Sequence, residues 1–247
     1  MRTLLFATSL LLACSANAEH PDEAGNAAHE GADRVVQVDH DQGIEVRYEG
    51  REPERGSGNR IRQTRPAGAF SRVIADDAMD VEIRIGPQAS IELEGDDNLI
   101  GRIRTEAERG TLHLRVRGGY HVRRAMVARI TVPRLERVDL QASGDGRISG
   151  LNGGRLALAS FGSGSFTAEG RVDELDIRIQ GSGDANLDGL RAGEARIQIN
   201  GSGDANAHVT DTIIATVNGT GEIVYRGEPR SVTEDVNGTG RISRRKD

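Results

Sequence analysis

Apolar and polar residues alternate along most of the chain. In 79–85 (MDVEIRI), 111–117 (TLHLRVR) and 125–132 (AMVARITV), apolar residues occupy every second position. This alternation is typical of β-strands that bury one face, because successive side chains point to opposite sides of a strand. Two shorter alternating segments, 34–39 and 44–48, precede them. Since no window of a dozen residues repeats with a helical period, the pattern predicts an all-β chain.

The second half of the chain repeats one short motif. Six copies of a unit similar to Gly-Ser-Gly-Asp follow one another, and their second glycines lie at positions 144, 164, 183, 203, 221 and 240. Successive copies are therefore 18 to 20 residues apart. A fixed period of this length indicates a repeat architecture, in which each unit buries its apolar face by stacking on its neighbours.

The alternation continues through the motif, so that its glycines lie on the same side as the apolar residues. In one copy that side comprises Leu175, Ile177, Ile179, Gly181 and Gly183. Inward glycines allow a sharp bend and a close approach of the neighbouring backbone. Coils of about 19 residues, stacked at the strand spacing of about 4.8 Å, predict a right-handed parallel β-helix, or solenoid, with more irregular strands in the N-terminal half. A sandwich of hairpins is the alternative, although hairpins rarely repeat one motif in register six times.

The opposite side of each strand points outward and carries three rows of polar residues. The amide row contains Gln180, Asn200, Asn218 and Asn237, continuing from Gln141. The hydroxyl row contains Ser143, Ser163, Ser182, Ser202, Thr220 and Thr239. The acidic row contains Asp145, Ser165, Asp184, Asp204, Glu222 and Arg241. Stacked amides and hydroxyls can hydrogen-bond between coils. The candidate ligand-binding residues taken from these rows are Ser182, Asp184, Asn200, Ser202, Asp204, Asn218, Thr220 and Glu222.

Like charges stacked on neighbouring strands destabilise a sheet, so the acidic row needs screening. Water, the flanking Arg178 and Arg196, or a bound cation would supply it. The repeats that bind calcium have a nine-residue spacing and extra glycines that are absent from this chain. We therefore expect no cofactor and no metal ligand, with calcium as the alternative.

An enzyme is the second function class to consider, because β-helices also carry polysaccharide lyases and hydrolases. The candidate acids are Asp184 and Asp204, with Arg196 or His208 nearby in the sequence. An Asp after Gly is, however, ordinary turn chemistry, and the chain has no Trp to stack on a sugar. Since nucleophile elbows and zinc motifs are also absent, we assign no catalytic residues.

The N-terminus has the features of an export signal. Residues 1–18 combine a basic start, an apolar run and the small-residue end Ala16-Asn17-Ala18, which predicts a signal peptide cleaved before Glu19 and a periplasmic or secreted protein. The alternative is an outer-membrane lipoprotein, because Leu11-Leu12-Ala13-Cys14 resembles a lipobox in which Cys14 is lipidated. No other stretch has the length and apolarity of a transmembrane span.

We expect residues 19–66 to form an acidic and flexible linker with short strand segments, and 67–247 to form the β-helical domain. The Gly-Ser-Gly-Asn piece in the charged stretch around residue 57 lacks the context of a phosphate-binding loop. The chain has a net charge of −6 and no basic block longer than Arg244-Arg245-Lys246, which excludes nucleic acid as an expected partner. The charged tail from Arg241 onward is predicted to cap the last coil.

Several short segments, in this order, resemble the bacterial head GIN domain family of auto-transporter adhesins. They are 70–74 (FSRVI), 79–83 (MDVEI), 94–99 (EGDDNL), 110–114 (GTLHL), 132–135 (VPRL) and the serial glycine motifs from residue 142 onward. The resemblance implies a β-helical, secreted or surface-associated domain with no established activity. We therefore expect a non-catalytic envelope domain that binds an envelope glycan or surface protein; a purely structural spacer is a further alternative.

Overall fold

The computed structural model describes residues 34–39, 43–48 and 52–246. The predicted signal peptide, Cys14 and the acidic segment up to residue 33 lie outside the described residues, as do 40–42, 49–51 and Asp247. No helix in the described part is long and apolar enough to cross a membrane.

The described chain is built from strands and one short 3-10 helix, which confirms the all-β prediction. The strands are β1 Arg34–Asp39, β2 Gly43–Tyr48, β3 Glu54–Arg55, β4 Arg60–Arg65, β5 Arg72–Ala75, β6 Met79–Ile85, β7 Ser90–Asp96, β8 Ile103–Glu108, β9 Thr111–Val116, β10 Tyr120–Val122, β11 Met126–Val132, β12 Arg137–Leu140, β13 Gly146–Asn152, β14 Arg155–Ser160, β15 Phe166–Gly181, β16 Ala185–Gly201, β17 Ala205–Gly219, β18 Glu222–Arg226, β19 Ser231–Gly238 and β20 Arg241–Arg244. The helix η1 spans Ile100–Arg102.

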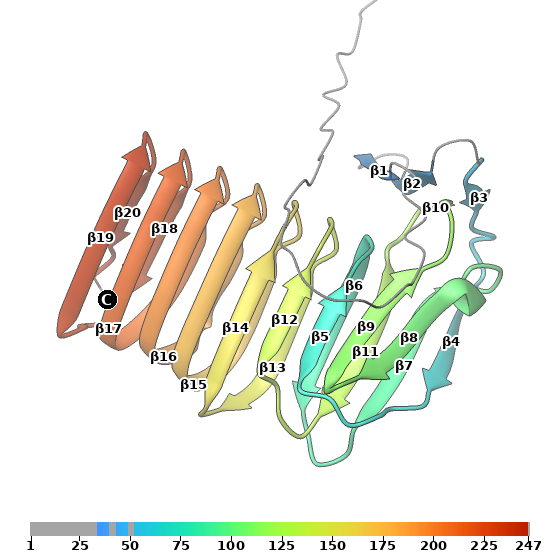
Figure 1. The fold of residues 1–247 in the computed structure, drawn as a ribbon, viewed down its shortest axis with the longest axis horizontal. Coiled ribbons are helices and arrows are strands. Elements are labelled where there is room, and N and C mark those ends of the chain that lie inside the picture. Colours follow the sequence, from blue (N-terminus) through green and yellow to red (C-terminus); the bar gives the residue numbers. More distant parts are fainter. Residues whose placement is uncertain (1–33, 40–42, 49–51, 247) are drawn as a thin grey trace, which may run out of the picture.

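From β13 to the C-terminus the chain winds into a regular solenoid with two walls (Figure 1). The long strands bend from one wall to the other: the first part of β15 pairs with β13, and its second part pairs with β14. All these pairings are parallel, and they join residues about one repeat apart, such as Ile177 with Ile197 and Ile197 with Ala215. The result is a β-solenoid of about 5 turns with bridges about 20 residues apart, as the glycine period predicts. Its right-handedness stays a prediction.

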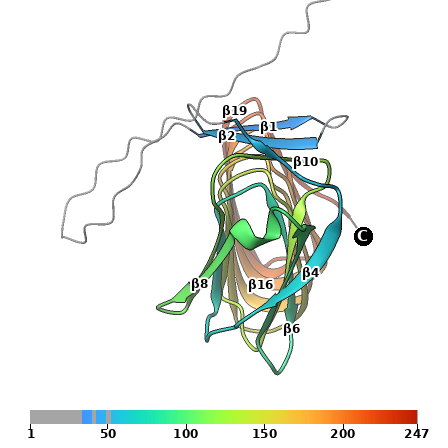
Figure 2. The same ribbon diagram turned by 90° about the vertical axis from the view of Figure 1, so that its right-hand side faces the viewer.

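The core fills the space between the two walls, which Figure 2 shows along the stack. Inward residues of successive coils, such as Ile177, Ile197 and Ala215, are fully buried and lie over one another. Because they are small or β-branched, they fit a thin layer between two closely spaced sheets. The scarcity of aromatic residues is thus compatible with a continuous apolar core.

The N-terminal half is less regular, as expected, because the chain does not build its coils in spatial order. Strand β6 lies between β11 and β13, and β5 lies between β9 and β12. After β6, therefore, the chain continues outward through β7 to β11 and then returns to place β12 beside β5. In this excursion β7 pairs antiparallel with β11, and β8 pairs antiparallel with β9.

The charged stretch before Phe70, predicted as a linker with short strand segments, contributes strands to this end of the molecule. Strand β4 pairs antiparallel with β7 from Arg60–Asp96 to Arg65–Ile91. A separate four-stranded sheet has the order β1-β2-β10-β3. The apolar periodicity does not single out β4, because most of its side chains are polar and exposed; its pairing is supported by ion pairs to Glu94 instead.

Candidate functional site

The repeated glycines form corners of the solenoid that leave no room for a side chain. A Cβ atom on Gly183 would lie 2.1 Å from the carbonyl oxygen of Gly164, and one on Gly203 would lie 1.9 Å from that of Gly183. In the last four copies the first glycine has a positive φ, 135° at Gly181, 148° at Gly201, 139° at Gly219 and 137° at Gly238. The second glycines from Gly144 to Gly221 are buried, as the alternation predicts, and the first ones from Gly162 to Gly219 are half-buried. In the last copy Gly240 is half-buried and Gly238 is exposed. The glycines therefore have a packing and conformational role.

The hydroxyl row from Ser163 onward lies on the outside of these corners, as predicted, whereas the hydroxyl group of Ser143 is buried. Ser182, Ser202 and Thr220 are exposed. Their backbone N–H groups donate to the first glycine carbonyl of the preceding coil, with N···O distances of 3.1, 3.0 and 2.9 Å. The backbone bonds thus hold the corners in register and leave the hydroxyl groups facing solvent.

The amide row is connected by side-chain hydrogen bonds along the stack. Asn218 Nδ2 donates to Asn200 Oδ1 at 2.7 Å, and Asn237 Nδ2 donates to Asn218 Oδ1 at 3.1 Å. Gln180 is aligned with Asn200 in the strand register. These amides stabilise neighbouring coils, since each one satisfies the next.

The acidic row is held by backbone amides of the following coil. Asp184 Oδ1 accepts the N–H of Asp204 at 2.8 Å, and Asp204 Oδ1 accepts the N–H of Glu222 at 2.7 Å. Arg178, one of the two arginines considered for screening this row, pairs with Asp176 at 3.5 Å on its own strand. Within the described residues, no hydrogen bond involves the second carboxylate oxygen of either Asp184 or Asp204.

The same row continues further toward the N-terminus than the glycine motif indicates. Ser165 Oγ accepts the N–H of Asp184, Asp145 Oδ1 accepts the N–H of Ser165, and Asp80 Oδ1 accepts the N–H of Asp145, at 3.0, 3.1 and 3.0 Å. Burial raises the pKa of Asp80, and the neighbouring Asp145 carboxylate adds to the effect. Sequence analysis did not assign Asp80 to the row because it lies in β6, outside any glycine copy.

The residues considered for catalysis occupy different parts of the coil. Asp184 and Asp204 lie at corners, whereas Arg196 lies on the wall strand β16, level with Asp176 and Ile214. His208 lies on β17, level with Arg191 and Arg226. The described residues contain no group of three or more His, Cys, Asp or Glu side chains that could hold a metal ion.

A shallow groove of about 450 Å³ runs over the outer face of β6, β11, β13 and β15. Outward polar side chains line it, among them Arg84, Thr131, Arg147 and Thr167. These residues come from strands that are far apart in the sequence, so the alternation predicts that each one faces outward but does not show that they lie together.

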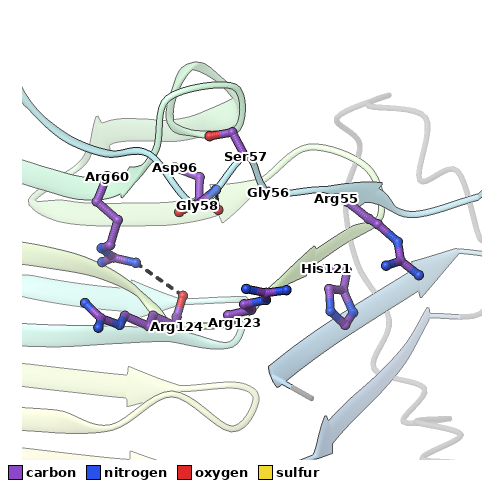
Figure 3. A pocket seen from close by; sticks show the side chains of 9 residues that line it. All are labelled: Arg55, Gly56, Ser57, Gly58, Arg60, Asp96, His121, Arg123 and Arg124. Atoms are coloured by element: carbon purple, nitrogen blue, oxygen red, sulfur yellow. Dashed lines mark hydrogen bonds between the residues drawn. The ribbon is translucent and has the colours of Figure 1, made fainter. Parts of the chain in front are cut away.

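A second and larger pocket, of about 960 Å³, lies at the N-terminal end of the stack (Figure 3). We call it the arginine pocket; its lining includes Arg55, Arg60, Arg123, Arg124, His121, Asp96 and the loop 56–58. It combines the β3–β4 loop, the end of β7 and the turn between β10 and β11. No sequence pattern indicates this pocket, because its basic residues are dispersed over about seventy positions.

The loop 56–58 is not a phosphate-binding loop, in agreement with the sequence analysis. Its backbone N–H groups already have acceptors: Gly56 donates to the carbonyl of His121 at 2.8 Å, Ser57 to Asn98 Oδ1 at 3.0 Å and Gly58 to Asp96 Oδ2 at 3.2 Å. The loop therefore serves as a rigid wall of the arginine pocket.

Comparison with known proteins agrees with this architecture. A family model described as "Putative auto-transporter adhesin, head GIN domain" matches residues 69–229. No curated protein matches the chain.

Three crystal structures are similar to the fold. A "putative adhesin" from Bacteroides fragilis is 22% identical with a TM-score of 0.62, covering 77% of this chain and 99% of that one. A "putative adhesin" from Parabacteroides merdae is 19% identical with a TM-score of 0.51, covering 79% and 100%. A "putative lipid binding protein" from Parabacteroides distasonis is 20% identical with a TM-score of 0.50, covering 78% and 100%. These likenesses concern the fold. Because the family model covers most of the chain, this protein belongs to the head GIN domain family.

Proposed function

We propose that the chain is a non-catalytic, exported domain of the cell envelope that acts by adhesion or ligand binding. The observation that carries the proposal is the repeated outward presentation of Ser182, Ser202 and Thr220 beside the acidic row. Equivalent groups recur on successive coils at the strand spacing of about 4.8 Å. The adhesin description of the family supports the same role.

The partner that suits this surface is an envelope glycan or a surface protein. The row of hydroxyls offers hydrogen-bond donors and acceptors at regular steps. Asp184 and Asp204 add acceptors, because within the described residues one oxygen of each carboxylate has no hydrogen bond. A polymer that carries hydroxyl groups along its length can engage several steps at once, so that weak single contacts add up.

The hydrogen bonds of the acidic row support a binding role over catalysis. One oxygen of each carboxylate is occupied in joining two coils, and the basic residues considered as their partners lie elsewhere along the coil. A general acid-base pair requires both groups within reach of one scissile bond.

A glycan array and a binding assay with isolated envelope fractions test the proposal. The row variant Ser182→Ala/Ser202→Ala/Thr220→Val is compared with the wild type. Ser149→Ala/Thr167→Ala, from the shallow groove over β6, β11, β13 and β15, is the matched outward control. We expect the row variant to lose most of the binding and the control to retain it. Absence of any partner for the wild type would contradict adhesion and favour a structural spacer.

Polysaccharide turnover distinguishes the enzyme alternative. Release of reducing ends by the wild type, abolished in a folded Asp184→Asn or Asp204→Asn variant, would contradict the non-catalytic proposal. Both variants should fold, because the carboxamide oxygen keeps the acceptor that joins the coils. We expect the wild type to release no reducing ends.

The export part of the proposal is tested separately by mass spectrometry of the protein recovered from its native host. A free Glu19 at the N-terminus is expected for a periplasmic or secreted protein. A lipid-modified Cys14 would instead assign the outer-membrane lipoprotein form, and an intact Met1 would contradict export altogether.

A further inference from the structure

We propose that the arginine pocket binds a phosphorylated ligand with at least two phosphate groups. The site is separate from the outward rows: β3, β4 and β10 lie at the opposite end of the molecule from β17 to β20 (Figure 1). It therefore goes beyond the adhesive function proposed above and is tested independently of it.

The pocket has an excess of positive charge. The side chains of Arg55, Arg123 and Arg124 make no hydrogen bond or ion pair with any residue in the described part of the chain, and all three are exposed. Against them the lining contains one carboxylate, Asp96, which is buried and already accepts the N–H of Gly58. Unpaired cations that line one pocket repel one another, so an anion bound in the pocket relieves the repulsion.

The other two basic groups of the lining are engaged and hold the walls in place. Arg60 donates through Nη1 and Nη2 to the carbonyl oxygens of Arg124 and Ala125, at 3.3 and 3.0 Å, and pairs with Glu94 at 3.3 Å. These bonds fix the turn that carries the two free arginines. Arg60 is thus a positioning residue, and the site is organised before a ligand arrives.

His121 supports the opposite side of the pocket. Its Nδ1 lies 3.2 Å from Glu45 Oε2, and its carbonyl oxygen accepts the N–H of Gly56. The loop 56–58 is thereby joined to β10, and Arg55, which immediately precedes it, stands beside His121 in Figure 3. Both walls are therefore held by hydrogen bonds, whereas the guanidinium groups between them remain available.

The arrangement of donors favours phosphate over carboxylate. The available donors are the guanidinium groups: Figure 3 shows Arg123 and Arg124 across the pocket from the loop 56–58, with Arg55 on β3 as a third. The loop itself is a wall, since its N–H groups already have acceptors. A planar carboxylate is satisfied by one guanidinium fork, whereas a tetrahedral phosphate accepts hydrogen bonds from several directions. A volume of about 960 Å³ also exceeds what a single inorganic ion requires, which favours two phosphate groups on one scaffold.

The test measures binding to the full-length exported protein by calorimetry at low and at physiological salt. The soluble probe is glucose 1,6-bisphosphate, with glucose as its uncharged counterpart. The membrane probe is a phosphatidylcholine vesicle containing cardiolipin, whose headgroup carries two phosphates, with pure phosphatidylcholine as its counterpart. Binding of the bisphosphate identifies a soluble phosphosugar source, and binding of the acidic vesicle identifies a lipid headgroup; either one supports the proposal.

The variants separate a built site from general charge attraction. Arg123→Ala/Arg124→Ala removes two free cations of the pocket, and Arg171→Ala/Arg191→Ala removes two exposed arginines that are aligned on adjacent coils of the solenoid. We expect the pocket variant to bind at least tenfold more weakly and the control to stay within twofold of the wild type. Both are checked for an unchanged melting temperature.

A further variant tests the geometry of recognition. Arg123→Lys keeps the charge and loses the planar fork, so we expect a loss of about threefold to tenfold. No binding of either phosphorylated probe by the wild type, or an equal loss in the Arg171/Arg191 control, would overturn the proposal. These results leave the glycan-array test of the outward rows unaffected.

Discussion

Asp184 and Asp204 are joined across one turn of the solenoid, because the Oδ1 atom of the first accepts the backbone N–H of the second at 2.8 Å. The residues expected to repel each other thus form part of a continuous series of bonds, in which each side chain satisfies the next coil's amide. A carboxylate that accepts an amide proton in this way is a charge-assisted acceptor.

Replacing the acceptor tests this role. We expect Asp184→Ala to lower the free energy of unfolding by about 1 kcal/mol, because the N–H of Asp204 loses its partner. Asp184→Asn keeps an oxygen at the same position and is expected to remain within about 0.5 kcal/mol of the wild type. Chemical denaturation measures both. Equal losses in the two variants would mean that the charge, and not the acceptor, supports the corner.

The inward glycines make a stronger prediction. A methyl group at Gly203 would meet the carbonyl oxygen of Gly183 at 1.9 Å, so Gly203→Ala is expected to cost about 3 kcal/mol or to prevent folding. Gly101→Ala is the matched control, since its Cβ would meet no atom within 4 Å. Thermal unfolding of both variants by circular dichroism is the measurement. A tolerated Gly203→Ala would show that the coils can separate at the corner.

The raised pKa of Asp80 predicts that the stability of the fold depends on pH. Its pKa is raised by burial above the value in the unfolded chain, so the folded state binds more protons between the two values. The stabilisation that comes from this preferential protonation of Asp80 is fully present below the pKa in the unfolded chain. It is lost as the pH rises through the pKa in the folded protein. We expect Asp80→Asn, which keeps the acceptor for Asp145, to melt at a higher temperature than the wild type at pH 7.

The difference in melting temperature between Asp80→Asn and the wild type should shrink as the pH approaches 3.5, where the wild-type carboxyl group is protonated. Glu106→Gln, which removes an exposed carboxylate, is the control for the change in net charge. A difference between Asp80→Asn and the wild type that stays constant from pH 7 to 3.5 would contradict the assignment to Asp80.

The C-terminal end of the stack predicts self-association. Strand β19 pairs with β17 alone among the described strands, and Val232 and Val236 are 45% and 41% exposed although they occupy inward positions. Open strand edges pair readily with other chains. We expect Val232→Lys/Val236→Lys to reduce association at high concentration in analytical ultracentrifugation. Ile61→Lys, at the other end, is the control; an equal reduction there would argue against the C-terminal edge.

The tail is expected to limit this association. Strand β20 covers the edge of β18, and Arg245 reaches back to Asp188 with N···O distances of 2.9 and 3.0 Å. Deleting 241–247 exposes β18 and should therefore increase the apparent mass in light scattering. A truncated chain that stays monomeric at the concentrations where the full chain does so would contradict a capping role.

The glycine period was sufficient to predict the solenoid because every coil places the same glycine corner over the corner before it, so that the spacing of the corners appears directly in the sequence. Each glycine is required by the carbonyl of the coil before it, and each outward residue follows from alternation along one strand. The sequence could therefore predict the outward placement of Ser182, Asp184 and their copies, but not that their bonds would run to backbone amides. Hydrogen-bond direction depends on the offset between coils, which the residue pattern does not encode.

By itself, then, the sequence determined the all-β class, the period of the coils and the parity of their glycines, since all three depend on residues close together in the chain. Only the tertiary structure decided the order of the N-terminal coils, the pairing of β4 with β7 and the assembly of the arginine pocket. Arg55, Asp96 and Arg123 become neighbours because β7 to β11 extend the sheet beyond β6 and β5, and because β3 then pairs with β10 and β4 with β7. Such pairing depends on contacts between distant segments, and it leaves no periodic signal in the sequence.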